Sequence, residues 1–230
     1  MKKAMILAAG HGTRMRPLTN HTPKPLLKVG GKPLIVWHIE KLAQAGFEDI
    51  VINIAWLADQ IPTALGDGEK YGVNLHYSDE QKDGALETAG GIVKALPLLL
   101  AENDEPFLVT NGDVWCDYQY NNQNPLTNDK LAHLILVNNP AHNPEGDFCL
   151  SPTDSSRLVK NEGSPKFTFS GIGYYHPDLF KNLDHGKRPL APLLRETMQK
   201  ELITGELFNG DWRDIGTPER LAELGSDLQK

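Results

Sequence analysis

Cysteine is scarce in this 230-residue chain, and its scarcity excludes several kinds of small stabilised domain. Only Cys116 and Cys149 occur, without the CxxC or Cys/His spacings of a redox motif or a metal site. A disulfide framework in a short secreted chain needs more cysteines than this. We therefore expect two reduced thiols and a cytoplasmic protein.

Long hydrophobic runs are also missing. The first nine residues begin like a secretory signal, with two lysines before an apolar stretch, but Gly10-His11-Gly12 ends that stretch early. The run from Ala95 to Ala101 is interrupted by Pro97 and is much shorter than a helix that crosses a bilayer. We expect no membrane partner.

Negative charge is absent from the first 39 residues, although the whole chain has a formal charge of −7. The seven basic residues of that segment, which leave −14 on the rest of the chain, are Lys2, Lys3, Arg14, Arg16, Lys24, Lys28 and Lys32. An acidic chain without aromatic side chains interleaved among basic ones is not typical of a nucleic-acid surface. The basic segment instead predicts binding of small anions such as phosphates.

Strand-like and helix-like segments alternate in the first half of the chain. A continuous apolar run at 4–9 predicts a strand buried on both faces, and apolar positions spaced i, i+3, i+4 and i+7 between Pro33 and Gly46 predict a helix. Further strands are expected at 50–54, 73–77 and 107–110, with a weak helix around Pro62 and a longer one at 87–100. This order is typical of an α/β fold with a Rossmann-like, mostly parallel sheet flanked by helices.

The second half has a mixed pattern. Short strands are expected at 131–137, 148–150, 157–159 and 167–175, and helices at 177–182, 189–200 and 218–229. The segment from Tyr118 to Asp129, rich in Asn and Gln, predicts a surface connection rather than a domain boundary. We expect one domain over residues 1–230.

The glycine-containing loop after the first strand carries the strongest signal of chemistry. Gly10-His11-Gly12 could open a dinucleotide-binding unit, but Met15 stands where GxGxxG has its third glycine. No Gly-Lys-Ser/Thr follows at the spacing of a P-loop either. The small residues let backbone N–H groups approach phosphate oxygens, and Arg14 and Lys24 add positive charge, so another type of phosphate-binding loop is expected.

The segment LAAGHGTRMRPLT at 7–19, followed by Pro23-Lys24-Pro25, resembles the signature of the sugar-1-phosphate nucleotidyltransferase family. The likeness extends through Asn111-Gly112-Asp113 to Trp212–Glu219, which matches the family element WxDIGTPE. It implies the nucleotide-diphospho-sugar transferase fold, with a nucleotide-binding half at 1–115 and a sugar-binding half at 116–230 that contains a small β/α part.

The resemblance implies functional residues at the matching positions. Catalysis would fall to Arg14, Lys24, Asp113 and Asp214, of which the two aspartates would also bind Mg²⁺. The nucleotide would be bound by Leu7, Ala8, Ala9, Gly10, Gly12, Thr13, Arg14, Lys24, Leu86, Thr88 and Gly90. The sugar would be bound by Asn111, Glu162, Ser170 and Gly171.

Two departures from the family pattern concern the sugar. Phe169 stands where relatives often have a polar residue, and the acid-lysine-proline pattern is replaced by 158–162, where either Lys160 or Glu162 could reach the sugar. No histidine is assigned to catalysis, because no HxxxH or Cys/His spacing occurs.

Three segments, 52–57, 111–115 and 190–195, resemble the subgroup that transfers UMP from UTP to N-acetylmuramic acid α-1-phosphate. That likeness implies a cytosolic enzyme of bacterial cell-wall sugar recycling, and a monomer is plausible. The alternatives are a mannose, heptose, glucose or choline phosphate with GTP, dTTP or CTP, or an inactive nucleotide-sugar-sensing domain, against which the retention of Arg14, Lys24, Asp113 and Asp214 counts.

Overall fold

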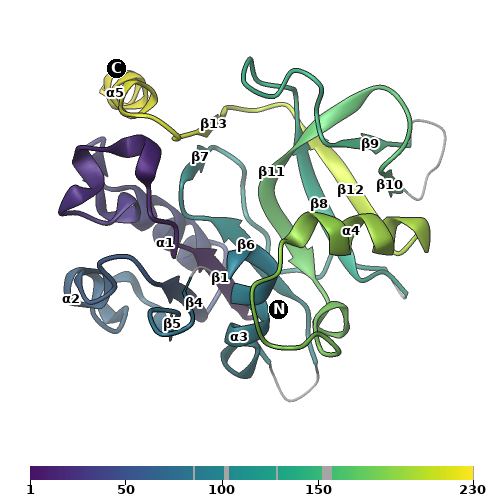
Figure 1. Ribbon diagram of the computed structural model, residues 1–230, viewed down its shortest axis with the longest axis horizontal. Coiled ribbons are helices and arrows are strands. Elements are labelled where there is room, and N and C mark those ends of the chain that lie inside the picture. The colour runs from purple at the N-terminus through teal and green to yellow at the C-terminus, as the bar shows by residue number, and fades with distance from the viewer. Residues whose placement is uncertain (85, 101–103, 128, 152–156, 230) are drawn as a thin grey trace.

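The computed structural model describes residues 1–84, 86–100, 104–127, 129–151 and 157–229. A mixed sheet forms its centre (Figure 1). Four parallel strands make one side of this sheet in the order β6-β1-β4-β5: β6 (Phe107–Asn111), β1 (Lys3–Leu7), β4 (Asp49–Ile54) and β5 (Asn74–Asp79). The strands β1, β4 and β6 are short and mostly apolar, as expected of strands covered on both faces, whereas the edge strand β5 is more polar and partly exposed.

The other side of the sheet is mostly antiparallel. The long strand β11 (Lys166–Tyr175) pairs antiparallel with β6 and with β8 (Ala132–Val137), and β12 (Ile203–Phe208) runs parallel to β8. The first residues of β11 also pair with β9 (Phe148–Leu150), which pairs with β10 (Val159–Lys160). The predicted α/β fold with a mixed sheet is confirmed.

Helices cover both faces of the sheet. The helices α1 (Leu34–Gln44) and α2 (Gln60–Leu65) pack on the face that receives Ala4 and Ile6 of β1. The helices α3 (Glu87–Leu99) and α4 (Leu190–Gln199) pack on the opposite face, with Met5. Successive strand residues point to opposite faces, so one strand contributes to two cores.

The end of the chain returns to its beginning. The strand β13 (Trp212–Asp214) pairs with β7 (Val114–Cys116), and α5 (Pro218–Asp227) then packs beside the hairpin of β2 (Lys28–Val29) and β3 (Lys32–Pro33). In Figure 1 the yellow α5 lies beside the purple N-terminal segments. The Thr217 hydroxyl accepts a hydrogen bond from the Arg220 N–H at 3.4 Å, so Thr217 caps α5.

Several short elements differ from the sequence prediction. The helix expected at 177–182 is only one 3₁₀ turn, η5 (Pro177–Leu179). The strands β12 and β13 were not predicted, because their few apolar residues carry no clear alternation and Gly205 interrupts β12. The strand expected at 157–159 is shifted to Val159–Lys160, and residues 152–156 lie outside the described residues.

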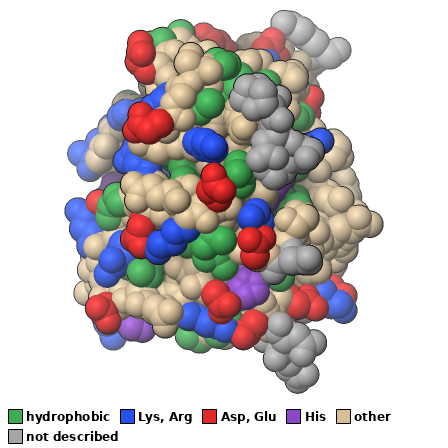
Figure 2. Space-filling view, turned by 90° about the vertical axis from the view of Figure 1, so that its right-hand side faces the viewer, with side chains coloured by type: hydrophobic (Ala, Val, Ile, Leu, Met, Phe, Trp, Pro, Cys, Tyr) green, Lys and Arg blue, Asp and Glu red, His purple; other side chains and the backbone are tan. Residues whose placement is uncertain are grey.

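The surface is charged and polar. Acidic and basic side chains are interspersed over the face drawn in Figure 2. Within the described ranges, no helix is both long enough and apolar enough to span a membrane.

Candidate active site

The carboxyl ends of the parallel strands open into a cavity of about 260 Å³. Leu7 ends β1 and Asn111 ends β6, and these two residues are register partners in the sheet. Ligands of open parallel sheets bind at this edge. The cavity is lined by Leu7, Ala8, Ala9, Gly10, Lys24, Pro25, Asn53, Glu80, Leu86, Glu87, Thr88, Asn111 and Asp113.

The loop after β1 is held by hydrogen bonds that leave Gly10 open. The Ala8 N–H donates to the Asn53 side-chain oxygen at 2.7 Å, and the Gly12 carbonyl accepts from the Thr19 hydroxyl at 2.7 Å. Gly12 has a φ of 60°, and a β-carbon there would lie 2.9 Å from the Thr19 methyl group. Glycine is therefore required at 12 by both conformation and space.

Lys24 and Asp113 form the central ion pair of the cavity. The Lys24 Nζ lies 2.7 Å from the Asp113 Oδ2, although 89 residues separate them in the sequence. The Lys24 side chain is only 9% exposed, whereas that of Asp113 is 37% exposed. The ammonium group is thus fixed from one side while the carboxylate remains open toward the cavity.

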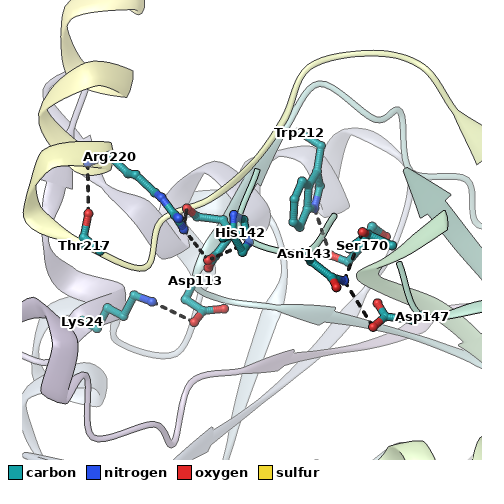
Figure 3. Close-up of polar contacts among 11 residues, drawn as sticks. Lys24, Asp113, His142, Asn143, Asp147, Ser170, Trp212, Thr217 and Arg220 are labelled. Carbon is teal, nitrogen blue, oxygen red and sulfur yellow. Dashed lines mark hydrogen bonds and ion pairs between the residues drawn. The ribbon is translucent and has the colours of Figure 1, made fainter. Parts of the chain in front are cut away.

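Asp214 reaches the same region through the pairing of β13 with β7. Asp214 is the register partner of Val114, and the Ile215 N–H donates to the Asp113 carbonyl at 3.0 Å. The Asp214 Oδ2 accepts a hydrogen bond from Arg220 at 2.7 Å and lies 3.5 Å from His142 Nε2. Figure 3 shows Lys24, Asp113, His142 and Arg220 converging from separate segments of the chain.

The two aspartates form a donor set that suits a hard divalent cation. Asp113 lies in the turn between β6 and β7 and Asp214 ends β13, and both side chains keep some exposure, 37% for Asp113 and 17% for Asp214. Among the described residues there is no group of three or more His, Cys, Asp or Glu side chains suited to a metal. Two carboxylates completed by water and substrate phosphates are the arrangement that Mg²⁺ favours.

Arg14 lies at the rim of this region. It belongs to the 3₁₀ turn η1 (Thr13–Met15), and a β-carbon on Gly216 would be 3.4 Å from its terminal nitrogen. The same β-carbon would be 2.9 Å from the Asp214 Oδ2, so the Arg14 guanidinium lies near Asp214. Thr13 is exposed and does not line the cavity.

A buried polar pair joins the glycine loop to the segment before α3. Asn53 accepts from Ala8, and its amide nitrogen donates to the Glu80 Oε1 at 2.7 Å. Glu80 is only 1% exposed, and this burial raises the pKa of its carboxyl group. Because Leu86 and Thr88 line the same cavity, the pair fixes two of its walls relative to each other.

A second cavity, of about 490 Å³, adjoins the first. Leu7, Glu87, Thr88 and Asn111 line both. The residues that line only the second cavity are Val109, Asp147, Phe148, Phe169, Gly171, Tyr175, Pro189, Leu190, Ala191, Leu194 and Arg195. The second cavity is mostly apolar, with charged groups at a few positions, as small-molecule sites usually are.

A hydrogen-bonded core supports the turn that carries Asp113. His38 lies behind it and contacts the Val114 carbonyl through Nε2 at 2.7 Å, and the Tyr120 hydroxyl through Nδ1 at 2.9 Å. The carbonyl can only accept, so Nε2 carries the proton and Tyr120 donates to Nδ1. Burial lowers the pKa of His38 to about 4. His38 is therefore neutral and structural at physiological pH.

Seven expected site residues line neither of the two cavities: Gly12, Thr13, Arg14 and Asp214, which lie close to the first, and Ser170, Glu162 and Gly90. The Ser170 hydroxyl donates to the Ile135 carbonyl at 2.7 Å and accepts from the Ile172 N–H at 3.1 Å, inside an irregularity of β11. Glu162 is exposed and borders another recess with Lys160. The Gly90 N–H donates to the Arg188 carbonyl at 3.1 Å, and a β-carbon there would overlap Gly186. Ser170 and Gly90 therefore support the protein framework, and Glu162 lies at the surface away from both cavities.

Sequence reasoning missed several residues of the site. Asn53 and Glu80 lie in or next to strands, His142 and Asp147 lie in an irregular loop, and Arg195 lies on a helix. The Asp147 Oδ2 accepts from the Phe169 N–H at 2.8 Å. Trp212 donates to the Ser170 carbonyl at 2.9 Å (Figure 3). A polar residue at the end of an apolar strand, as Asn53 is, was the one usable signal.

Comparison with known sequences identifies similar proteins along the whole chain. A family model described as nucleotidyl transferase matches residues 3–230. The chain is 54% identical over 226 residues to the N-acetylmuramate alpha-1-phosphate uridylyltransferase of Neisseria meningitidis serogroup B, with 96% of each chain covered. It is 32% identical to the mannose-1-phosphate guanyltransferase of Yarrowia lipolytica, with 94% of this chain and 61% of that protein covered.

Solved structures share the fold. A Bacillus anthracis structure described as a glucose-1-phosphate thymidylyltransferase superposes with a TM-score of 0.82 at 23% identity, covering 99% of this chain and 95% of that one. The inositol-1-phosphate CTP transferase of T. maritima gives a TM-score of 0.75 at 17% identity, covering 100% of this chain and 97% of that one. At these identities the likeness concerns the arrangement of sheet and helices.

Proposed function

This chain belongs to the nucleotidyl transferase family, and from that membership we propose that it transfers UMP from UTP to N-acetylmuramic acid α-1-phosphate. UDP-N-acetylmuramic acid and pyrophosphate are the products. The 54% identical relative carries that activity in its name, which supports the choice of nucleotide and sugar. The observation that carries the chemistry is the meeting of the glycine loop, Lys24, Asp113 and Asp214 at one edge of the sheet.

The reaction is an in-line displacement at the α-phosphorus of UTP. An oxygen of the sugar phosphate forms the new bond, and the bond to the β-phosphate oxygen breaks, so that pyrophosphate leaves. The attacking phosphate is already ionised at neutral pH, and the protein need not remove a proton from it. Positioning and neutralisation of charge are then the main contributions of the protein.

Different residues in and beside the first cavity would position the phosphates and neutralise their charge. The backbone after β1, open at Gly10, lies where phosphate oxygens can approach its N–H groups. Lys24 would supply positive charge inside the cavity, and Arg14 would supply it from outside the cavity wall, near Asp214. Asp113 and Asp214 would hold Mg²⁺, which when bound supplies charge neutralisation and alignment of the phosphates.

The second cavity is the place for the sugar. It shares Asn111 and Thr88 with the first cavity, so a sugar bound there would have its 1-phosphate at the shared wall. Gly171 lines it from β11, and Asn111 lines both cavities. We place the reaction in cell-wall sugar recycling in the bacterial cytoplasm, in keeping with the proposed substrate.

The test is pyrophosphate release over a panel of UTP, GTP, CTP and dTTP with the 1-phosphates of N-acetylmuramic acid, mannose and glucose, with and without a chelator of Mg²⁺. We expect the highest kcat/KM for UTP with N-acetylmuramic acid 1-phosphate, and no release after chelation. Preference for GTP with mannose 1-phosphate would replace the proposed substrates. Absence of release from every pair would favour a nucleotide-sugar-sensing role.

A further inference from the structure

The proposed sugar carries a charge that most sugar phosphates lack. N-acetylmuramic acid has a lactyl ether on its third oxygen, and the carboxylate of that group is ionised at neutral pH. N-acetylglucosamine 1-phosphate is the same molecule without the lactyl group. An enzyme that prefers the first needs a partner for the additional carboxylate, because a desolvated charge without a partner weakens binding.

The second cavity offers few candidates for that partner. Its described lining is mostly apolar, and its charged side chains are those of Glu87, Asp147 and Arg195. Glu87 and Asp147 would repel a carboxylate, and Asp147 already accepts hydrogen bonds from Phe169 and Asn143. Arg195 is therefore the cation available among the described residues of this wall.

Arg195 is held in a way that leaves donors free. Its Nε donates to the Asn161 side-chain oxygen at 3.0 Å, which fixes the plane of the guanidinium group. No ion pair links Arg195 to a carboxylate within the described parts of the chain. The two terminal nitrogens can then form the paired hydrogen bonds that arginine makes with carboxylates.

The position of Arg195 separates it from the reacting phosphates. Arg195 lines the second cavity only, on the helix α4, whereas Lys24 and Asp113 line the first cavity only. A sugar with its 1-phosphate at the shared wall would direct ring substituents toward α4. The cation at 160 is not an alternative, because Lys160 lies outside this cavity and is 3.8 Å from the carboxylate of Glu201.

We propose that Arg195 is a specificity-determining residue that binds the lactyl carboxylate of the sugar phosphate, oriented by Asn161. This inference rests on the proposed function and names the residue that determines the preference for N-acetylmuramic acid 1-phosphate over N-acetylglucosamine 1-phosphate. The contact contributes to binding of the acceptor and takes no part in the transfer itself.

The experiment compares two acceptors in three proteins. Pyrophosphate release is measured with the 1-phosphates of N-acetylmuramic acid and of N-acetylglucosamine, using wild type, Arg195→Gln and Lys200→Gln. Lys200 is an exposed lysine directly after α4, outside both cavities, and its replacement removes the same charge. We expect Arg195→Gln to lower the ratio of the two kcat/KM values about 10- to 100-fold, as for loss of a charged hydrogen bond. Lys200→Gln should leave the ratio unchanged.

A chemical variant of the acceptor gives an independent readout. The methyl ester of the lactyl carboxylate removes the charge from the substrate, so wild type should lose activity on the ester by the factor that Arg195→Gln loses on the free acid. Arg195→Gln should handle ester and acid alike, because the interaction is already absent.

The results that would overturn the inference differ from those that would overturn the proposed function. Equal losses on both sugars would mean that Arg195 binds a group common to both, such as the phosphate, and would overturn the inference. An undiminished preference in Arg195→Gln would overturn it as well while leaving the proposed function standing. Pyrophosphate release by wild type from neither sugar would refute the proposed function, and the inference with it.

Discussion

His38 should make this protein lose stability in mild acid. It is fully enclosed behind the turn that carries Asp113, and burial lowers its pKa from 6.5 to about 4. The unfolded chain binds a proton at His38 near pH 6.5, while the folded chain does not until about pH 4. Stability from the neutral imidazole is therefore complete above pH 6.5 and is lost as the pH falls toward 4.

The size of the effect follows from the two pKa values. Their separation corresponds to a loss of roughly 3 kcal/mol once the pH is at or below 4, and of about 2 kcal/mol at pH 5. Other groups titrate over the same pH range, so measurements on wild type alone cannot isolate the contribution of His38 to stability. His38→Gln can, because glutamine keeps an N–H for the Val114 carbonyl and does not titrate.

Urea unfolding of both proteins, followed by tryptophan fluorescence between about pH 8 and about pH 5, measures the difference. Wild type should lose about 2 kcal/mol more than His38→Gln over this interval. Parallel pH dependence of the two proteins would mean that His38 titrates in the folded state as it does in the unfolded state, and would refute the argument.

Three further predictions concern the site. Lys24→Ala should lower kcat/KM about 10²- to 10³-fold while changing the urea midpoint little, because its partner Asp113 is partly solvated. A large drop in the urea midpoint alongside the loss of kcat/KM would contradict this. Gly10→Ala should raise the KM for the nucleotide without destabilising the fold, since no atom lies within 4 Å of the new methyl group; the control Gly225→Ala, in α5, should leave KM unchanged. Asn53→Ala should cost about 2–3 kcal/mol in urea unfolding by leaving the Ala8 N–H and Glu80 without their partner; a loss below 1 kcal/mol would show that water replaces it.

Local patterns in the sequence predicted the elements that build the floor of the site. The apolar runs of β1, β4 and β6 and the spacing within α1 depend on neighbours a few residues away, which a single sequence displays. The glycine loop was also visible in the sequence, because Ala8, Ala9, Gly10 and Gly12 lie close together along the chain, although its hydrogen bond to Asn53 was not.

Other parts of the site depend on residues distant in the sequence. The hydrogen bond between Asn53 and Glu80 forms only because β4 and β5 lie side by side in the folded sheet, so the sequence does not show it. Asp214 reaches the site only through the pairing of β13 with β7. Ser170 was expected at the sugar, but the irregular pairing of β11 turns its hydroxyl to the backbone. Lys160 ends the edge strand β10 and Glu162 follows it, and both border a recess outside the two cavities.

The most direct measurement follows the α-phosphate of UTP. UTP labelled at the α-phosphorus is incubated with N-acetylmuramic acid 1-phosphate, Mg²⁺ and either wild type or Asp113→Asn, with urea unfolding as the check that both proteins are folded. The account predicts label in UDP-N-acetylmuramic acid with wild type, none in pyrophosphate, and little transfer by a stable Asp113→Asn. Undiminished transfer by Asp113→Asn, or label in pyrophosphate, would contradict it.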